Sequence, residues 1–165
     1  MIRPTASALR QLKACGLRPT RQRLALAKLL LEGGPRHVTA EEVYQEAHTT
    51  GIPVSLATVY NTLHQFTSAG LMIEVVVGSG QSYFDNNPTS HWHYFDKSTG
   101  EIIDVPDDAI EFTKLPEPPP GKVIERIDVV VRIRNADGRP RGQAAGRGDA
   151  SRGSEPGGAA VTGDR

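Results

Sequence analysis

Residues 55–70 read Ser-Leu-Ala-Thr-Val-Tyr-Asn-Thr-Leu-His-Gln-Phe-Thr-Ser-Ala-Gly, and this stretch decides the fold of the N-terminal half. Its apolar residues recur at helical spacing on one face, and hydroxyl and amide side chains occupy the other. Ser55 is suited to cap the start of the helix, and Gly70 to end it in the left-handed conformation. Uncharged polar side chains on an exposed helix face suit the edges of bases better than they suit a merely solvated surface.

Further helices are predicted before this segment. Thr20 is placed to cap a helix over residues 21–31, which Gly33-Gly34-Pro35 ends. Thr39 and Glu42 have the spacing of a capping box and begin a helix that runs toward residue 50, and residues 5–15 form a weaker first helix. Compact helices with short connections, ending in the helix over 55–69, indicate a helix-turn-helix.

The pattern changes to strands after Gly70. Residues 71–77 and 81–85 read as two strands joined by a glycine turn, and a hairpin directly after such a helix is the wing of a winged helix. Farther on we expect a second hairpin over residues 91–96 and 101–105 and a short helix over 107–112. After a proline-rich connector, apolar residues alternate over 123–134, which predicts a long strand.

The expected fold class is therefore α+β, an N-terminal winged helix-turn-helix followed by a small α/β domain. We expect a DNA-binding domain over residues 1–86, a dimerisation and ligand-sensing domain over 87–134, and a tail over 135–165. The tail contains eight glycines and almost no large apolar side chain, so we expect it to be disordered.

Charge supports this division. The net charge is zero, but residues 1–70 hold eight basic and four acidic residues, whereas residues 71–134 hold six basic and eleven acidic residues. A basic block fits a polyanion partner, and an acidic one fits a cation site or an assembly role. Cys15 is the only cysteine, which excludes intramolecular disulfides and a thiolate zinc cage. The sequence has no apolar run of membrane-spanning length and no secretory signal, so we expect a cytoplasmic protein without membrane contact.

A histidine and carboxylate group marks a candidate metal site. His91 and His93 lie two residues apart on a predicted strand and so project to the same face. Asp85 ends the preceding predicted strand and Asp104 lies on the partner strand, so both can approach the two histidines. We also expect Glu101 and Glu111 within reach of this point. Mixed imidazole and carboxylate ligands suit Zn, Fe, Mn or Co. Two surface histidines beside an acidic patch are an equally good interpretation of this pattern alone.

The residues His91, His93 and Asp104 also suit a non-haem iron enzyme, which is the alternative from another functional class. That alternative leaves the basic helix-turn-helix without a role. The sequence also has no Ser-His-Asp arrangement, phosphate-cradling glycine loop or dinucleotide fingerprint. We therefore expect no catalytic activity.

Three segments together resemble the ferric uptake regulator family of metal-responsive repressors, and the resemblance runs from about residue 5 to Arg134. They are Gly16-Leu-Arg-Pro-Thr-Arg-Gln-Arg23, His37-Val-Thr-Ala-Glu-Glu-Val-Tyr44 and Val54-Ser-Leu-Ala-Thr-Val-Tyr-Asn-Thr-Leu63. Within the family, Tyr83-Phe-Asp85, His91-Trp-His93 and the segment 115–134 are most similar to the iron response regulator branch of alphaproteobacteria.

The resemblance implies a homodimer that binds double-stranded promoter DNA at an iron control element and regulates iron and haem genes. It also implies a divalent metal ion, Zn, Fe or Mn, at a site between the two domains. Carried over residue by residue, that site consists of His37, Asp85, His91, His93 and Asp104. A second acidic site of the family is incomplete because Ser90 and Trp92 replace two of its ligands, and the usual zinc cysteines are replaced by Asp96 and Thr99.

The branch implies haem as an effector, with His91 and His93 as the haem ligands. The Cys-Pro haem motif of some members is absent, because Cys15 is followed by Gly16. A zinc- or manganese-responsive repressor of the same family is the other alternative.

Seven residues are predicted to contact DNA. The four on or next to the helix over 55–69 lie nearest bases or phosphates, and Tyr60 has an alternative role in bracing that helix. The three arginines hold phosphates or reach the minor groove. The predicted set is Arg18, Arg21, Arg23, Ser55, Thr58, Tyr60 and Asn61.

Overall fold

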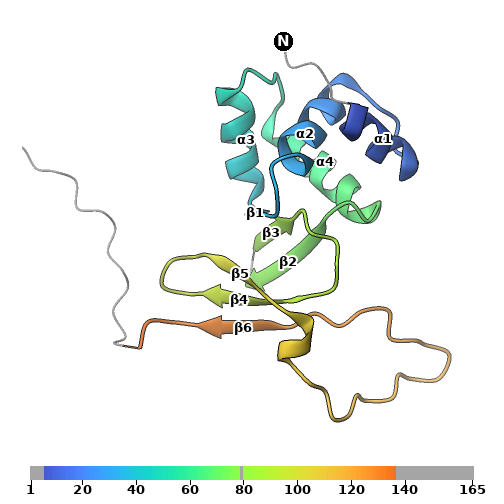
Figure 1. Cartoon of the computed structure of the whole chain (residues 1–165), viewed down its shortest axis with the longest axis vertical. Coiled ribbons are helices and arrows are strands. Elements are labelled where there is room, and N and C mark those ends of the chain that lie inside the picture. The colour runs from blue at the N-terminus through green and yellow to red at the C-terminus, as the bar shows by residue number, and fades with distance from the viewer. Residues whose placement is uncertain (1–5, 79, 137–165) are drawn as a thin grey trace, which may run out of the picture.

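Helices form the N-terminal part of the chain in a computed structural model, which describes residues 6–78 and 80–136 (Figure 1). They are α1 (Ala6–Ala14), α2 (Arg21–Leu31), α3 (Ala40–Thr49) and α4 (Leu56–Ser68).

The predicted caps are present. The Thr20 hydroxyl accepts a hydrogen bond from the Arg23 backbone N–H, and Ser55 does the same for Thr58. Thr39 and Glu42 form both bonds of a capping box. These caps satisfy backbone donors that a helix start would otherwise leave unpaired.

The helices enclose one apolar core. On α4, the side chains of Val59, Leu63 and Phe66 are fully buried, whereas those of Asn61 and Gln65 are exposed. The division of this helix into a packing face and a polar face is confirmed. The core continues into the other helices and β3 through Leu12, Leu26, Leu30, Val43 and Phe84.

A three-stranded sheet follows, which we call the wing sheet. It comprises β1 (His37–Val38), β2 (Ile73–Gly78) and β3 (Gln81–Asp85), in the order β1-β3-β2 with antiparallel pairing. The β2–β3 hairpin is the predicted wing. The short strand β1 joins from the connection between α2 and α3, so this sheet ties the helices to the hairpin.

A second sheet comprises β4 (Trp92–Asp96), β5 (Ile102–Val105) and β6 (Val130–Ile133), in the order β5-β4-β6. The strand β4 pairs antiparallel with β5 and parallel with β6. Figure 1 shows this sheet on the side of the wing sheet away from the helices. The α+β class is thereby confirmed.

The two sheets contact each other through a small apolar cluster. Val75 and Tyr83 of the wing sheet are buried in it, and Phe95 and Val130 of the second sheet pack against them. The Tyr83 hydroxyl donates to the Gly100 carbonyl at 2.6 Å. Packing and polar contacts together hold the sheets in one arrangement.

Two predicted elements are wrong in extent. The strand predicted over 123–134 is confined to β6, and Val123 is 85% exposed. The ladder is short because β6 pairs with only four residues of β4. The helix predicted over 107–112 is a single 3₁₀ turn, η1 (Asp107–Ala109), whose start has no side-chain cap.

The remaining predictions concern the ends of the chain and membranes. Of the tail predicted over residues 135–165, the part after Ala136 lies outside the described residues. Within the described ranges, every helix is too short or too polar to cross a bilayer.

Candidate metal centre

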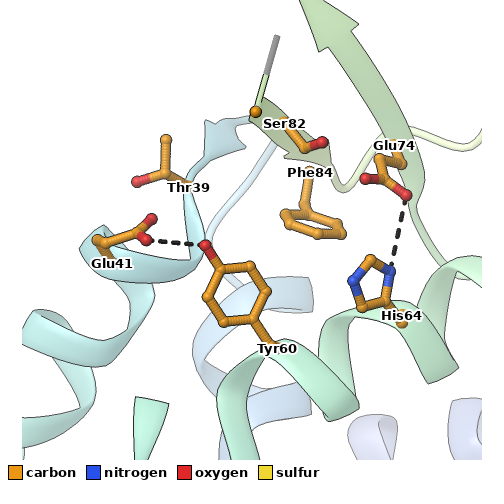
Figure 2. Close-up of a pocket in the computed structure, with 8 residues that line it drawn as sticks. Thr39, Glu41, Tyr60, His64, Glu74, Ser82 and Phe84 are labelled. Atoms are coloured by element: carbon orange, nitrogen blue, oxygen red, sulfur yellow. Dashed lines mark hydrogen bonds and ion pairs between the residues drawn. The ribbon is translucent and has the colours of Figure 1, made fainter. Parts of the chain in front are cut away.

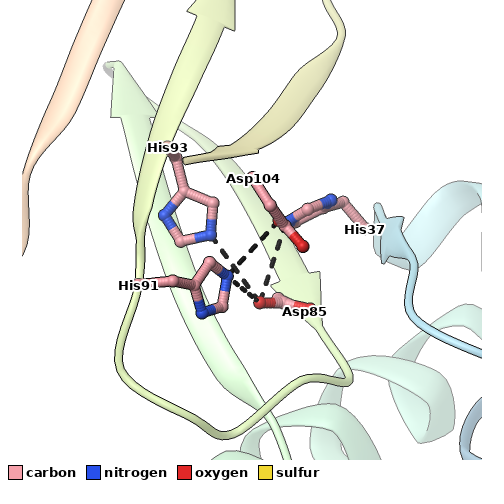
Figure 3. A group of neighbouring side chains, drawn as sticks. All are labelled: His37, Asp85, His91, His93 and Asp104. Atoms are coloured by element: carbon pink, nitrogen blue, oxygen red, sulfur yellow. Dashed lines mark ion pairs between the residues drawn. The ribbon is translucent and has the colours of Figure 1, made fainter. Parts of the chain in front are cut away.

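Five side chains meet between the wing sheet and the second sheet (Figure 3). Each offers one imidazole nitrogen or carboxylate oxygen, and these atoms all lie within 4.8 Å of one another. The five are those that the resemblance implies as metal ligands: His37, Asp85, His91, His93 and Asp104.

Strand register brings the ligands together. His37 on β1 is paired with Asp85 on β3, so the wing sheet presents one histidine and one carboxylate side by side. His93 on β4 is paired with Asp104 on β5, so the second sheet presents the same combination. His91 comes from the segment that links the sheets and completes the group. The site exists only where the two sheets meet.

Asp85 lies at the centre of the group. Its Oδ2 atom is 2.9 Å from Nε2 of His91, 3.6 Å from Nε2 of His93 and 3.7 Å from Nε2 of His37. Asp104 approaches from the more exposed side, with Oδ1 3.0 Å from His37 Nε2 and 3.3 Å from His91 Nε2. Its side chain is 40% exposed, whereas that of Asp85 is fully buried.

Four of these atoms are buried without a hydrogen bond. They are Nε2 of His37, His91 and His93, and Oδ2 of Asp85. Buried polar atoms are almost always hydrogen-bonded, because each unsatisfied one costs about 1–3 kcal/mol. Four of them aimed at one point fit coordination of a cation.

Contacts outside the group orient two of the ligands. Nδ1 of His91 lies 2.8 Å from the Thr89 carbonyl, which only accepts, so Nδ1 carries the proton and Nε2 keeps its lone pair toward the centre. Oδ1 of Asp85 accepts from the Asn87 backbone N–H at 2.8 Å, which leaves Oδ2 facing the histidines. Such outer contacts fix the tautomer and direction of metal ligands.

The electrostatics favour an ionised Asp85 carboxylate beside a neutral His37 imidazole. Burial lowers the pKa of His37, and its carboxylate neighbours offset this only in part. Burial raises the pKa of Asp85, but His93, the Asn87 N–H and the other two histidines more than reverse this, and the net pKa is below its ordinary value. Neutral imidazole and ionised carboxylate are the forms that bind metal.

The donor set consists of three imidazole nitrogens and two carboxylate oxygens, with no sulfur. This combination suits Zn, Fe or Mn. Glu101 and Glu111, which we expected within reach, are not in the group. The carboxylate of Glu101 instead accepts from the Thr99 hydroxyl.

The residues predicted to contact DNA lie around the start of α4 and along α2. Ser55 caps α4, and its hydroxyl lies 2.9 Å from that of Thr58. Asn61 is exposed on the polar face of α4. Arg21 is exposed at the start of α2, and Arg18 is exposed in the segment just before this helix.

Arg23 has a structural contact that the sequence did not indicate. Its Nε and Nη2 atoms both donate to Oε1 of Gln65, at 3.1 and 2.6 Å, and Nη1 donates to the Arg18 carbonyl. The guanidinium therefore joins α2 to α4. The spacing of 42 residues between the two partners gives no local pattern from which to predict the contact.

Asn86 also makes structural contacts that the sequence did not indicate. Its Nδ2 donates at 2.7 Å to the carbonyls of Leu30 and Gly34, and its Oδ1 accepts from the Arg36 N–H at 2.8 Å. Asn86 directly follows Asp85, and Arg36 directly precedes His37. One side chain thus fixes the backbone next to two of the ligands.

The chain is similar in sequence to a known repressor. The peroxide-responsive repressor PerR of Staphylococcus aureus (strain Mu50 / ATCC 700699) is 34% identical over 97 residues, which are 59% of this chain and 65% of that protein. The match thus spans slightly less than two thirds of that relative.

Solved structures cover more of the chain. The ferric uptake regulator from Pseudomonas aeruginosa with manganese matches at a TM-score of 0.60 and 27% identity, over 78% of this chain and 98% of the other. The ferric uptake regulator of Vibrio cholerae matches at a TM-score of 0.59 and 25% identity, over 76% and 98%.

These relatives are named as a repressor and as regulators, so they favour regulation over the enzyme alternative. The sequence profile of the ferric uptake regulator family matches residues 14–116, which is more than half of the chain. The chain belongs to the ferric uptake regulator family.

Proposed function

We propose that this chain is a metal-dependent transcription repressor that binds promoter DNA as a homodimer. The observation that carries the proposal is the five-residue group, which draws ligands from the helix-bearing wing sheet and from the second sheet. A similar protein named as a repressor and a ferric uptake regulator of similar fold support it.

The ligands couple metal binding to the arrangement of the two parts. A bound divalent cation supplies the positive charge that two carboxylates and the lone pairs of three imidazoles require. His37 and Asp85 then hold the helices and the wing, and His93 and Asp104 hold the second sheet. In a dimer built on the second sheet, the angle between these parts sets the spacing of the two α4 helices, and only one spacing fits two half-sites.

The polar face of α4 supplies sequence recognition in this proposal. Ser55, Thr58, Tyr60 and Asn61 face bases or adjacent phosphates in the major groove. Arg18 and Arg21 contact phosphates, and Arg23 contributes while it also orients Gln65. Removal of a phosphate contact weakens binding to all DNA sequences alike, whereas removal of a base contact changes the preference for one sequence over another.

Footprinting on promoter DNA, combined with affinity measurements, tests this division. We expect Asn61→Ala to reduce the preference for the protected site over random DNA. Arg21→Ala should weaken both and lower the slope of log K against log salt by about 1.8, since the homodimer loses one phosphate contact of about 0.9 in each subunit. Unchanged discrimination in Asn61→Ala would remove its reading role.

The finer form of the proposal is a response to iron and haem at iron and haem genes. Haem needs an axial ligand, and His91 and His93 are the candidates. Both rings turn their Nε2 atoms toward Asp85 and are nearly buried, so ligation of haem iron requires the group to open. Haem and a bridging cation therefore exclude each other, and haem favours the form without DNA affinity.

A spectroscopic titration tests the haem step. We expect haem to bind wild type with a Soret shift and to bind the His91→Ala/His93→Ala variant at least tenfold more weakly. Equal affinity for both proteins would refute haem binding at these histidines. Competition between Zn, Mn and Fe in the same assay tests the zinc- or manganese-responsive alternative, which the manganese-containing relative favours.

A further inference from the structure

The side chain of Tyr60 on α4 is held by a residue of another helix. Its hydroxyl donates to Oε1 of Glu41, on the first turn of α3, at 2.8 Å (Figure 2). A hydroxyl bonded to a carboxylate is a charge-assisted pair, which is stronger than a bond between neutral groups. The tyrosine hydroxyl therefore has a fixed partner before any DNA arrives.

The ring of Tyr60 is supported from the other side. It stacks on His64, one turn farther along α4, with the ring planes 22° apart and the centroids 6.4 Å apart. Nδ1 of His64 lies 3.6 Å from a carboxylate oxygen of Glu74 on β2. Figure 2 shows Tyr60 reaching toward Glu41 of α3, and His64 beside it reaching toward Glu74 of the wing. Preorganised side chains lose less entropy on binding.

The Tyr60 side chain is still accessible. Tyr60 is 37% exposed and borders an open cavity of about 470 Å³. A tyrosine hydroxyl has one proton and two lone pairs, so committing the proton to Glu41 leaves only acceptor capacity. Hydrogen bonding to Glu41 also raises the pKa of Tyr60, so the hydroxyl keeps this proton at neutral pH.

We propose that Glu41 sets the polarity of Tyr60, so that the tyrosine hydroxyl accepts from an exocyclic amino group in the major groove, N6 of adenine or N4 of cytosine. Thymine O4 and guanine O6 are acceptors and give this hydroxyl no bond. Glu41 is a positioning residue that determines specificity without touching DNA. This inference rests on the proposed function, in which α4 enters the major groove.

The experiment starts from operator sequences that metal-loaded wild-type protein selects from a random duplex library. Each adenine of the selected site is then replaced by purine, and each cytosine by its analogue without the N4 amino group. We expect one position, present once in each half-site, where removal of the amino group weakens wild-type binding. The expected loss in affinity is about fivefold, which corresponds to one hydrogen bond.

Variants assign the effect. Tyr60→Phe should show no loss on amino removal at that position, because its ring stays and its acceptor is gone. Glu41→Ala frees the hydroxyl proton, so the hydroxyl can also donate. This variant should bind operators with thymine or guanine at that position about as well as those with adenine or cytosine. The matched control Glu32→Ala removes a carboxylate from the C-cap of α2 and should keep the wild-type preference.

The outcomes separate this inference from the proposed function. Wild-type protein that selects no sequence would contradict the proposed function. A selected operator whose binding is insensitive to amino removal in wild type, or equally sensitive in Tyr60→Phe, would overturn the role of Tyr60. Wild-type preferences in Glu41→Ala would overturn the role of Glu41. Circular dichroism spectra that match wild type establish that each variant is folded.

Discussion

His37 of β1 and Asp104 of β5 lie 3.0 Å apart, Nε2 to Oδ1, although they belong to two different sheets. The contact closes the group of five ligands from its exposed side. A cation bound there is stabilising only when both sheets are in place. Metal binding and the arrangement of the two sheets are therefore linked by mass action.

Zinc should stabilise the chelator-treated protein. At a free zinc concentration of a hundred times Kd the expected gain in the free energy of unfolding is about 2.7 kcal/mol, seen as a rise in Tm of several degrees. His37→Ala should lose most of this rise, because one ligand and the only contribution from β1 are gone. His48→Ala, an exposed histidine on α3, is the matched control. Equal rises in His37→Ala and wild type would contradict the site.

The metal-free protein should lose stability in acid. The pKa of His37 is lowered by burial, so between its folded value and about 6.5 the unfolded chain binds a proton that the folded chain does not. The free energy of unfolding then falls as the pH drops below about 6.5. The pKa of Asp85 is below its usual 3.8, so its contribution is present above that value and is lost as the pH falls through the folded value.

Urea unfolding between pH 8 and pH 3 in the presence of chelator measures this dependence. His37→Gln should flatten the decrease near neutral pH and leave the one at lower pH. A decrease near neutral pH as steep in His37→Gln as in wild type would show that another group is responsible.

Asn86→Ala should weaken both the fold and the metal site. Its amide makes hydrogen bonds to the carbonyls of Leu30 and Gly34 and to the N–H of Arg36, and losing them should cost about 2 kcal/mol in the free energy of unfolding. Because the backbone beside His37 and Asp85 is then less fixed, zinc affinity should fall several-fold. Gln45→Ala, at an exposed position on α3, serves as control. Wild-type zinc affinity in a destabilised Asn86→Ala protein would separate the two effects and refute the second.

Arg23 and Gln65 should show coupled effects on stability. Each single alanine variant removes the pair of hydrogen bonds that joins α2 to α4, so the double variant should lose about 1 kcal/mol less than the sum of the single losses. A double-mutant cycle by urea unfolding measures the coupling. Additive losses would mean that the contact contributes nothing to the free energy of unfolding.

Local patterns in the sequence predicted much of the N-terminal fold. The caps at Thr20, Thr39 and Ser55 and the β2–β3 hairpin of the wing depend on residues close in the chain, and the structure contains all of them. The strand β6 was overestimated because alternating apolar residues show that a segment suits a sheet without showing how many residues of a neighbour are there to pair. Strand length depends on the partner, which is distant in sequence.

The candidate metal site was predictable in part. The spacing of His91 and His93 indicated a common face, but His37 lies 48 residues before Asp85 and entered only through the family resemblance. Its position follows from the pairing of β1 with β3, a long-range contact that no local pattern contains. The bonds from Arg23 to Gln65 and from Tyr60 to Glu41 escaped prediction for the same reason.

The central claim is that the five ligands make DNA binding depend on a metal ion. The most direct test is the affinity for a selected operator, measured by fluorescence anisotropy with zinc and with chelator, for wild type, His37→Ala and His48→Ala. We predict that chelator weakens binding by wild type and His48→Ala at least tenfold and leaves His37→Ala at the same weak affinity in both conditions. Operator affinity in His37→Ala that equals wild type and still rises with zinc would contradict the claim.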